Sequence, residues 1–117
     1  MERAVADPVH ASVLTAARWP GVEIRLLVAL QTVAAEGSFS HAARKLGYTQ
    51  SAVSGQILAL ERAVGARLLD RVRGARSVEL TSEGRILVQH ASVITARLGA
   101  AQAEIEALRG SPRLRAV

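Results

Sequence analysis

Basic side chains are concentrated in one stretch of this chain. Residues 41–76 contain seven Lys or Arg residues and two carboxylates, so this stretch alone carries +5, equal to the formal net charge of the whole sequence. Lys and Arg bind a polyanion such as a nucleic acid well, because each phosphate that they neutralise releases condensed counterions. The alternative is an ordinary solvated basic surface, and the elements that carry these side chains decide between the two.

Side chains that could support catalysis or bind a metal lack a suitable arrangement. His10, His41 and His90 lie in separate segments without metal-ligand spacing, and the chain has no cysteine. It also has no glycine-rich phosphate loop and no nucleophile motif built from Ser and Asp. We therefore expect that the chain is not an enzyme and has no cofactor, no metal and no small-molecule site.

Small hydrogen-bonding residues mark a predicted helix-turn-helix. Ser40 is placed to accept from the free backbone N–H groups of a short helix over residues 41–46, and Thr49 to do the same for a helix over residues 50–64. Residues 47–49 form the short turn between these two helices. Such a pair of helices is the helix-turn-helix arrangement.

The outward face of the helix over residues 50–64 is expected to read bases. Its apolar residues recur at helical spacing from Val53 to Val64 and must meet the core. The opposite face is rich in short hydrogen-bonding side chains, which suit base edges in a major groove. The predicted base-reading residues are Gln50, Ser51, Ser54, Gly55 and Leu58.

Residues 71–80 read as two short strands about a glycine-containing turn, which is a hairpin or wing. Arginines on such a wing can reach a phosphate or a narrow minor groove. The predicted backbone and wing contacts are Ser38, Ser40, Thr49, Arg71, Arg73 and Arg76. Of these, Ser40 has at least an equal claim to be only a helix cap.

Two further helices complete the pattern. An apolar stripe predicts a first helix that begins near Val22 and ends at Gly37. Thr81 is placed to cap a last helix, in which apolar residues alternate at spacings of four and three, as in helices that pair along their length. The predicted dimerisation residues are Leu87, Ala91, Ile94, Leu98, Ala101, Ile105 and Leu108. A second copy of the chain is the expected cover for this stripe.

These elements predict a mainly α fold, a winged helix-turn-helix of three helices and a short β-hairpin followed by a long dimerisation helix. We divide the chain into a variable N-terminal extension (1–21), the DNA-binding domain (22–80), the linker or dimerisation helix (81–110) and a tail or truncation point (111–117). Apolar runs are too short to span a bilayer, and the N-terminus has no export signal. We expect no membrane partner and a cytoplasmic location, at the nucleoid when the chain is bound to DNA.

From Ile24 to Gly84 the chain resembles the DNA-binding region of LysR-type bacterial transcription regulators. The matching pieces occur in the family's order and spacing. They are Glu36 to Leu46 (EGSFSHAARKL), Gln50 to Ser54 (QSAVS), Gln56-Ile57, Leu60-Glu61, Gly65 and Leu80 to Gly84 (LTSEG). The chain departs from the family at Gly55 and Leu58, where relatives often have basic or bulky residues, and at Leu69, where phenylalanine is common.

The resemblance implies a DNA-binding transcription regulator that forms a homodimer or a higher homo-oligomer through its linker helix. Its third helix would enter the major groove of double-stranded DNA, and its wing would touch the flanking backbone. The chain would be the DNA-binding portion alone, without the family's effector domain. Two alternatives stay open: a winged-helix protein of another family, such as a molybdate-responsive regulator, and a dimerising interaction module that modulates a longer regulator.

Overall fold

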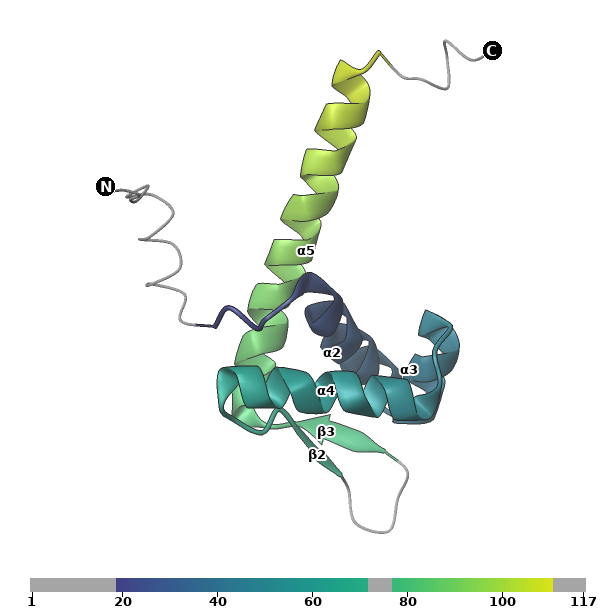
Figure 1. The fold of residues 1–117 in the computed structure, drawn as a ribbon, viewed down its shortest axis with the longest axis vertical. Coiled ribbons are helices and arrows are strands. Elements are labelled where there is room, and N and C mark those ends of the chain that lie inside the picture. The colour runs from purple at the N-terminus through teal and green to yellow at the C-terminus, as the bar shows by residue number, and fades with distance from the viewer. Residues whose placement is uncertain (1–18, 72–76, 111–117) are drawn as a thin grey trace, which may run out of the picture.

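A computed structural model describes residues 19–71 and 77–110. Within these ranges the chain forms four helices and a two-stranded hairpin (Figure 1). In chain order these are α2 (Ile24–Glu36), α3 (Phe39–Leu46), α4 (Gln50–Val64), β2 (Leu69–Arg71), β3 (Val78–Leu80) and α5 (Ser82–Leu108). The predicted winged helix-turn-helix with a long last helix is confirmed. Arg73 and Arg76 lie outside the described residues, as do the segments before residue 19 and after residue 110.

Most helix boundaries follow from local chemistry, as predicted. The Thr49 hydroxyl oxygen accepts from the N–H of Ala52 at 3.0 Å, and the Thr81 hydroxyl oxygen accepts from the N–H of Gly84 at 2.9 Å. Each bond satisfies one of the backbone donors that the first turn of a helix leaves free. The ends of α2, α3 and α4 are formed by glycines with φ values of 77°, 76° and 76°, a conformation that L residues rarely adopt.

The prediction that Ser40 caps the second helix is wrong. Ser38 is the cap: its backbone is extended, and its hydroxyl oxygen accepts from the N–H of His41 at 3.1 Å. The helix therefore begins at Phe39, and Ser40 lies within its first turn. The physical reason is the burial of Phe39, whose ring joins the core and draws the start of α3 back by two residues.

The core lies where α3, α4 and α5 pack against α2. Leu30 and Val33 of α2 are fully buried, and so are Val53 and Leu60 of α4 and Leu68 just beyond it. Burying one such aliphatic side chain stabilises the fold by about 1.5–3 kcal/mol. These aliphatic contacts hold α3 and α4 at a fixed angle, and thereby hold the outward face of α4 in place.

The hairpin is tied to the helical body at both strands. β2 and β3 pair antiparallel, with Leu69 opposite Leu80 and Arg71 opposite Val78. Beyond the ladder, the N–H of Val78 donates to the carbonyl oxygen of Gly37 at 3.0 Å. The wing therefore has a fixed origin beside α4, where Figure 1 shows it.

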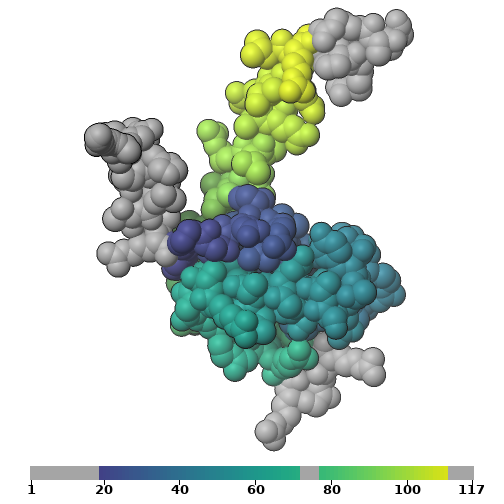
Figure 2. Space-filling model, in the orientation of Figure 1, coloured from purple at the N-terminus to yellow at the C-terminus, as the bar shows by residue number. Residues whose placement is uncertain are grey.

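The 27-residue helix α5 has two different halves. In its first half, Leu87 is half-buried and Ala91 is fully buried against the core, and Gln31 of α2 donates to the Thr95 hydroxyl oxygen at 3.4 Å. From residue 96 to residue 110 every residue except the half-buried Glu106 is exposed, and this half projects from the body (Figure 2). The expectation that the whole stripe lacks cover within the chain is thus corrected, because the chain's own core covers Ala91. Among the described residues, no helix is long and apolar enough to cross a membrane.

Candidate nucleic-acid interface

Helix α4 turns one face to the core and the other to solvent. Val53, Ile57 and Leu60 are buried. The exposed stripe on the opposite side runs along the helix at spacings of four, three and four residues and consists of Ser51, Gly55, Leu58 and Arg62. Gln50 is exposed at the N-terminal tip, and Ser54 is half-buried at the edge of the stripe. The structure thus brings all five predicted base-reading residues to one surface.

The N-terminal end of α4 is suited to a negatively charged ligand. The helix macrodipole places a partial positive charge there, and phosphates bind well at such ends. Thr49 is exposed at this end. Its hydroxyl oxygen accepts from the N–H of Ala52, and its hydroxyl proton can still be donated to a phosphate. Ser40 is exposed on the first turn of α3. Ser38 is buried, and capping α3 uses its hydroxyl as an acceptor.

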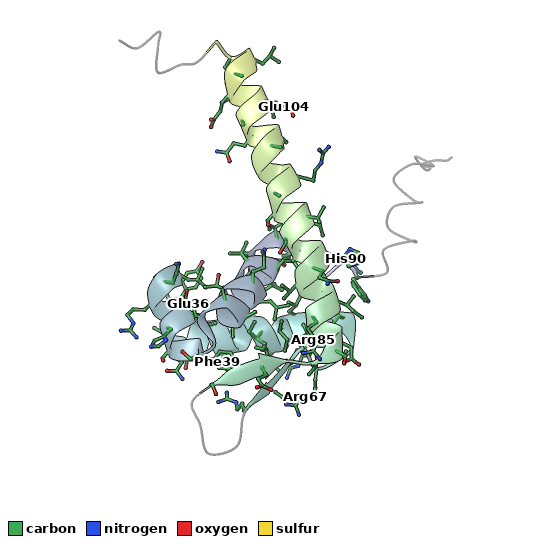
Figure 3. All side chains as sticks on the ribbon, turned by 180° about the vertical axis from the view of Figure 1, so that it is seen from behind. Glu36, Phe39, Arg67, Arg85, His90 and Glu104 are labelled. Carbon is green, nitrogen blue, oxygen red and sulfur yellow. The ribbon has the colours of Figure 1, made fainter. Side chains whose placement is uncertain are left out.

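Arg71 connects the wing to the helix-turn-helix. It is exposed at the end of β2, and its guanidinium carbon lies 5.0 Å from the centroid of the Phe39 ring at the start of α3. A cation over an aromatic face at this distance is stabilised by about 0.5–1 kcal/mol at an exposed site. Figure 3 labels Phe39 on the side of the hairpin that faces the helices. This contact holds a positive charge close to the exposed stripe of α4.

Arg71 also lines a hollow between α4 and the wing. The hollow has a volume of about 400 Å³, and its lining includes Ser54 and Leu58 of α4 and Leu69 of β2. Basic, hydroxyl and apolar groups therefore share one concave surface with the Glu61 carboxylate, which is hydrogen-bonded to the backbone at the start of the wing. Such a mixture of groups suits the phosphates and base edges of a duplex better than it suits a purely apolar ligand.

Glu61 fixes the wing, and sequence reasoning missed this role. One carboxylate oxygen of Glu61 accepts from the N–H of Leu68 at 2.8 Å and from the N–H of Leu69 at 3.4 Å. Glu61 is also the only carboxylate in α4, the signal that could have singled it out. The bond joins the C-terminal half of α4 to the start of β2.

Arg67 is turned toward the base of the wing (Figure 3). It donates to the carbonyl oxygen of Leu69 at 3.3 Å and lies 3.4 Å from the carboxylate of Asp70. Both partners of this ion pair are largely exposed, so the pair contributes little to stability. Among the described residues, no group of three or more His, Cys, Asp and Glu side chains could hold a metal ion.

Comparisons with known proteins identify the family. Residues 24–85 match the model for the bacterial regulatory helix-turn-helix proteins of the lysR family. The transcriptional regulator ShiR of Corynebacterium glutamicum is 43% identical over 89 residues, which are 76% of this chain and 30% of ShiR. AlsR of Bacillus subtilis is 41% identical over 78 residues, 67% of this chain and 25% of AlsR. The chain thus spans about a third or less of the length of these relatives.

Solved structures similar to this chain include DNA complexes. The CbnR_DBD–DNA complex matches with a TM-score of 0.69 and 31% identity over 75% of this chain and 99% of that one. The BenM_DBD complex with benA site 1 DNA matches with a TM-score of 0.70 and 33% identity over 75% of this chain and 97% of that one. These matches favour the LysR type over the molybdate-responsive alternative. The chain belongs to the LysR family of bacterial regulatory helix-turn-helix proteins and covers the family's DNA-binding domain and the helix that follows it.

Proposed function

We propose that this chain binds specific duplex DNA by placing α4 in the major groove, with the β2–β3 wing against the adjacent backbone. The observation that carries the proposal is the exposed polar end of α4, fixed by a buried face and flanked by Arg71. Two similar structures, those of CbnR_DBD and BenM_DBD, are DNA complexes, which supports the same ligand class here. We also infer that the chain acts at the nucleoid, in the bacterial cytoplasm.

The proposed contacts divide into two kinds. Gln50, Ser51 and Ser54 would hydrogen-bond base edges, because side chains at the tip of a recognition helix reach them first. Ser40, Thr49 and Arg71 would contact phosphates, together with Arg73 and Arg76, which lie outside the described residues. Ser38 caps α3 and is buried, so we propose that it stabilises the start of α3 and does not contact a phosphate itself.

We further propose that the chain forms a homodimer through α5. Its projecting half exposes Leu98 and Ile105 by 54% and 51%, which are large values for leucine and isoleucine. Trp19, Val22 and Ile86 line an apolar hollow of about 670 Å³, and Ile94 lines it too, so the hollow adjoins the exposed stripe. A second copy of α5 laid on this surface would remove the apolar area from water and present two copies of α4 to two half-sites.

The base-reading proposal is tested by the ratio of two affinities. Duplexes that bind the wild-type chain are first selected from a randomised pool. The ratio is the affinity for a selected duplex divided by the affinity for a shuffled duplex of the same composition. Replacing Gln50 or Ser51 by alanine should lower this ratio by about 5- to 150-fold, which corresponds to about 1–3 kcal/mol, because a base contact is lost while phosphate contacts remain. Gln102→Ala removes an amide that is also exposed, on α5, and should leave the ratio unchanged.

Two results would speak against this assignment. Equal losses on selected and shuffled duplexes would show that Gln50 and Ser51 only position the chain. A wild-type chain that favours no duplex over its shuffled counterpart would remove sequence-specific binding altogether. The exposed half of α5 would then favour the alternative function, a module that pairs with a longer regulator.

A further inference from the structure

One apolar side chain stands on the surface that otherwise carries polar and basic groups. Leu58 is 47% exposed. All of α4 is described, and within this helix Leu58 is the only large hydrophobic residue that is exposed. The core does not need it, because Val53, Ile57 and Leu60 form the buried face of the helix. The Leu58 side chain is therefore free to contact an apolar group outside the chain, on a surface that otherwise carries polar and basic groups.

The surroundings of Leu58 separate it from the surface proposed for dimerisation. Leu58 borders the hollow between α4 and the wing, together with Ser54 and Arg71. The exposed apolar residues of the stripe, such as Leu98 and Ile105, lie on the projecting half of α5. A second copy that covers α5 would thus leave Leu58 on the face of α4 that is proposed to meet DNA.

Gly55 leaves space beside Leu58 on the same stripe. A Cβ atom built at Gly55 would meet no atom within 4 Å, so that side of the helix is open. Without a side chain at this position, the backbone of α4 can approach a groove floor closely, as glycine allows at ligand contacts. Ser51, one turn before Gly55, offers a hydroxyl next to this open stretch.

Major-groove chemistry supplies the partner. The four bases present hydrogen-bond donors and acceptors there, and the apolar group among them is the C5-methyl of thymine. We propose that Leu58 is a specificity-determining residue that packs against a thymine methyl group, with Gly55 providing the clearance for that contact. The inference rests on the proposed entry of α4 into the major groove. It adds that the recognised half-site contains a thymine whose methyl group, and not only its hydrogen-bonding edge, contributes to binding.

The test replaces thymine by deoxyuridine, which removes the methyl group and keeps the base pair. Duplexes selected on the wild-type chain are resynthesised with deoxyuridine at one thymine pair at a time. The wild type should lose about fourfold in affinity at one thymine of each half-site, which corresponds to the burial of one methyl group. Leu58→Ala should bind the thymine duplex more weakly and should show no further loss on the deoxyuridine duplex.

Controls make the result specific to Leu58. Val93→Ala shortens an aliphatic residue on α5 that is also exposed, and it should keep the full sensitivity to deoxyuridine. Leu58→Gln is a second variant that removes the apolar contact, and it should likewise lose the sensitivity to deoxyuridine. The helical circular dichroism of both Leu58 variants should equal that of the wild type, because this side chain lies outside the core.

The outcomes separate this inference from the proposed function. If the wild type prefers its selected duplex but is indifferent to every deoxyuridine, the inference is overturned while DNA recognition stands. The same holds if Leu58→Ala keeps the wild-type sensitivity to deoxyuridine. If the wild type shows no preference among duplexes, the proposed function fails, and the inference fails with it.

Discussion

Residues on α4 either stabilise the fold or form the exposed surface, and at Gly55 these two requirements differ. A glycine inside a helix lowers stability by about 0.5–1 kcal/mol relative to alanine. Nothing in the structure stands within 4 Å of an added Cβ at Gly55, so packing does not require glycine there. Gly99 of α5 has equally open surroundings. Gly55 differs from Gly99 in its place on the surface proposed to meet DNA, and we therefore assign it to that proposed contact and use Gly99 as the control.

Gly55→Ala and Gly99→Ala should each raise the free energy of unfolding by about 0.5–1 kcal/mol, since both remove backbone entropy from the unfolded chain. Urea unfolding at one fixed protein concentration measures this. Only Gly55→Ala should also weaken binding to a selected duplex, because its methyl group fills the space along the exposed stripe. Unchanged DNA affinity in Gly55→Ala would show that the helix stands clear of the bases at this point.

Residue chemistry also sets how far the sequence could predict helix ends. Thr49 and Thr81 cap their helices as predicted, because a threonine just before a helical pattern is placed to accept from the free N–H groups of the first turn. Ser38 and Ser40 both fit the cap of α3 by residue type. Burial of Phe39 between them decides for Ser38, and that burial depends on the packed core, which local sequence does not show.

At the level of elements, the wing is positioned by contacts from the end of α2, from α4 and from the start of α5. The hairpin itself was predictable from its strand-like residues and glycine-containing turn, but β2 begins at Leu69, two residues before the predicted start at Arg71. The bond from Glu61 to the N–H groups of Leu68 and Leu69 was not, since it forms only after the chain reverses beyond α4. Arg71 over Phe39 likewise joins residues that are distant in sequence.

Glu61→Ala should lower the free energy of unfolding by about 1–3 kcal/mol, because the buried N–H of Leu68 loses a charged acceptor. Glu61→Gln keeps an oxygen acceptor and should lose less. Amide hydrogen exchange at Leu68 and Leu69 should accelerate in the alanine variant more than exchange in α2 does. Glu104→Ala on the projecting half of α5 (Figure 3) serves as the control and should change neither quantity. Wild-type stability in Glu61→Ala would refute the role given to this carboxylate.

The junction of α5 with the wing depends on a close approach at Gly84. A Cβ atom at this position would clash with the carbonyl oxygen of Leu68 and press on the Leu80 side chain. Gly84→Ala should therefore destabilise the fold by about 1–3 kcal/mol, the usual range for overpacking. Gly99→Ala, a substitution of the same type in the same helix, should stabilise it. Thermal unfolding compares the two, and shifts of the same sign would contradict this account of the junction.

At the scale of the whole molecule, α5 links the DNA-binding body to a surface that needs a partner. The 4-3 spacing of its apolar residues predicted helix pairing but could not show where the chain's own core stops covering the stripe. In the first half, Ala91 is buried against the body, and the stripe from Ile94 to Leu108 is left exposed. The helix is about 40 Å long, so its exposed half extends well beyond the body (Figure 2).

Leu98→Asp should convert the proposed dimer to a monomer, because a carboxylate would then be buried in an apolar interface. The helix-turn-helix should stay folded, since Leu98 does not contact the core cluster. Sedimentation equilibrium at micromolar concentration measures the mass, and circular dichroism checks the fold. Ala96→Asp places the same charge at an exposed position outside the stripe and should remain dimeric. A monomeric wild type, or a dimeric Leu98→Asp variant, would remove α5 as the dimer interface.

Methylation interference can show whether α4 enters the major groove of a specific duplex. Dimethyl sulfate methylates guanine N7 in the major groove and adenine N3 in the minor groove, so one experiment compares the two grooves on one selected duplex. We expect methylation of guanine N7 within each half-site to block binding, because a recognition helix occupies that groove. Interference confined to adenine N3, with all guanine N7 positions tolerated, would contradict the account.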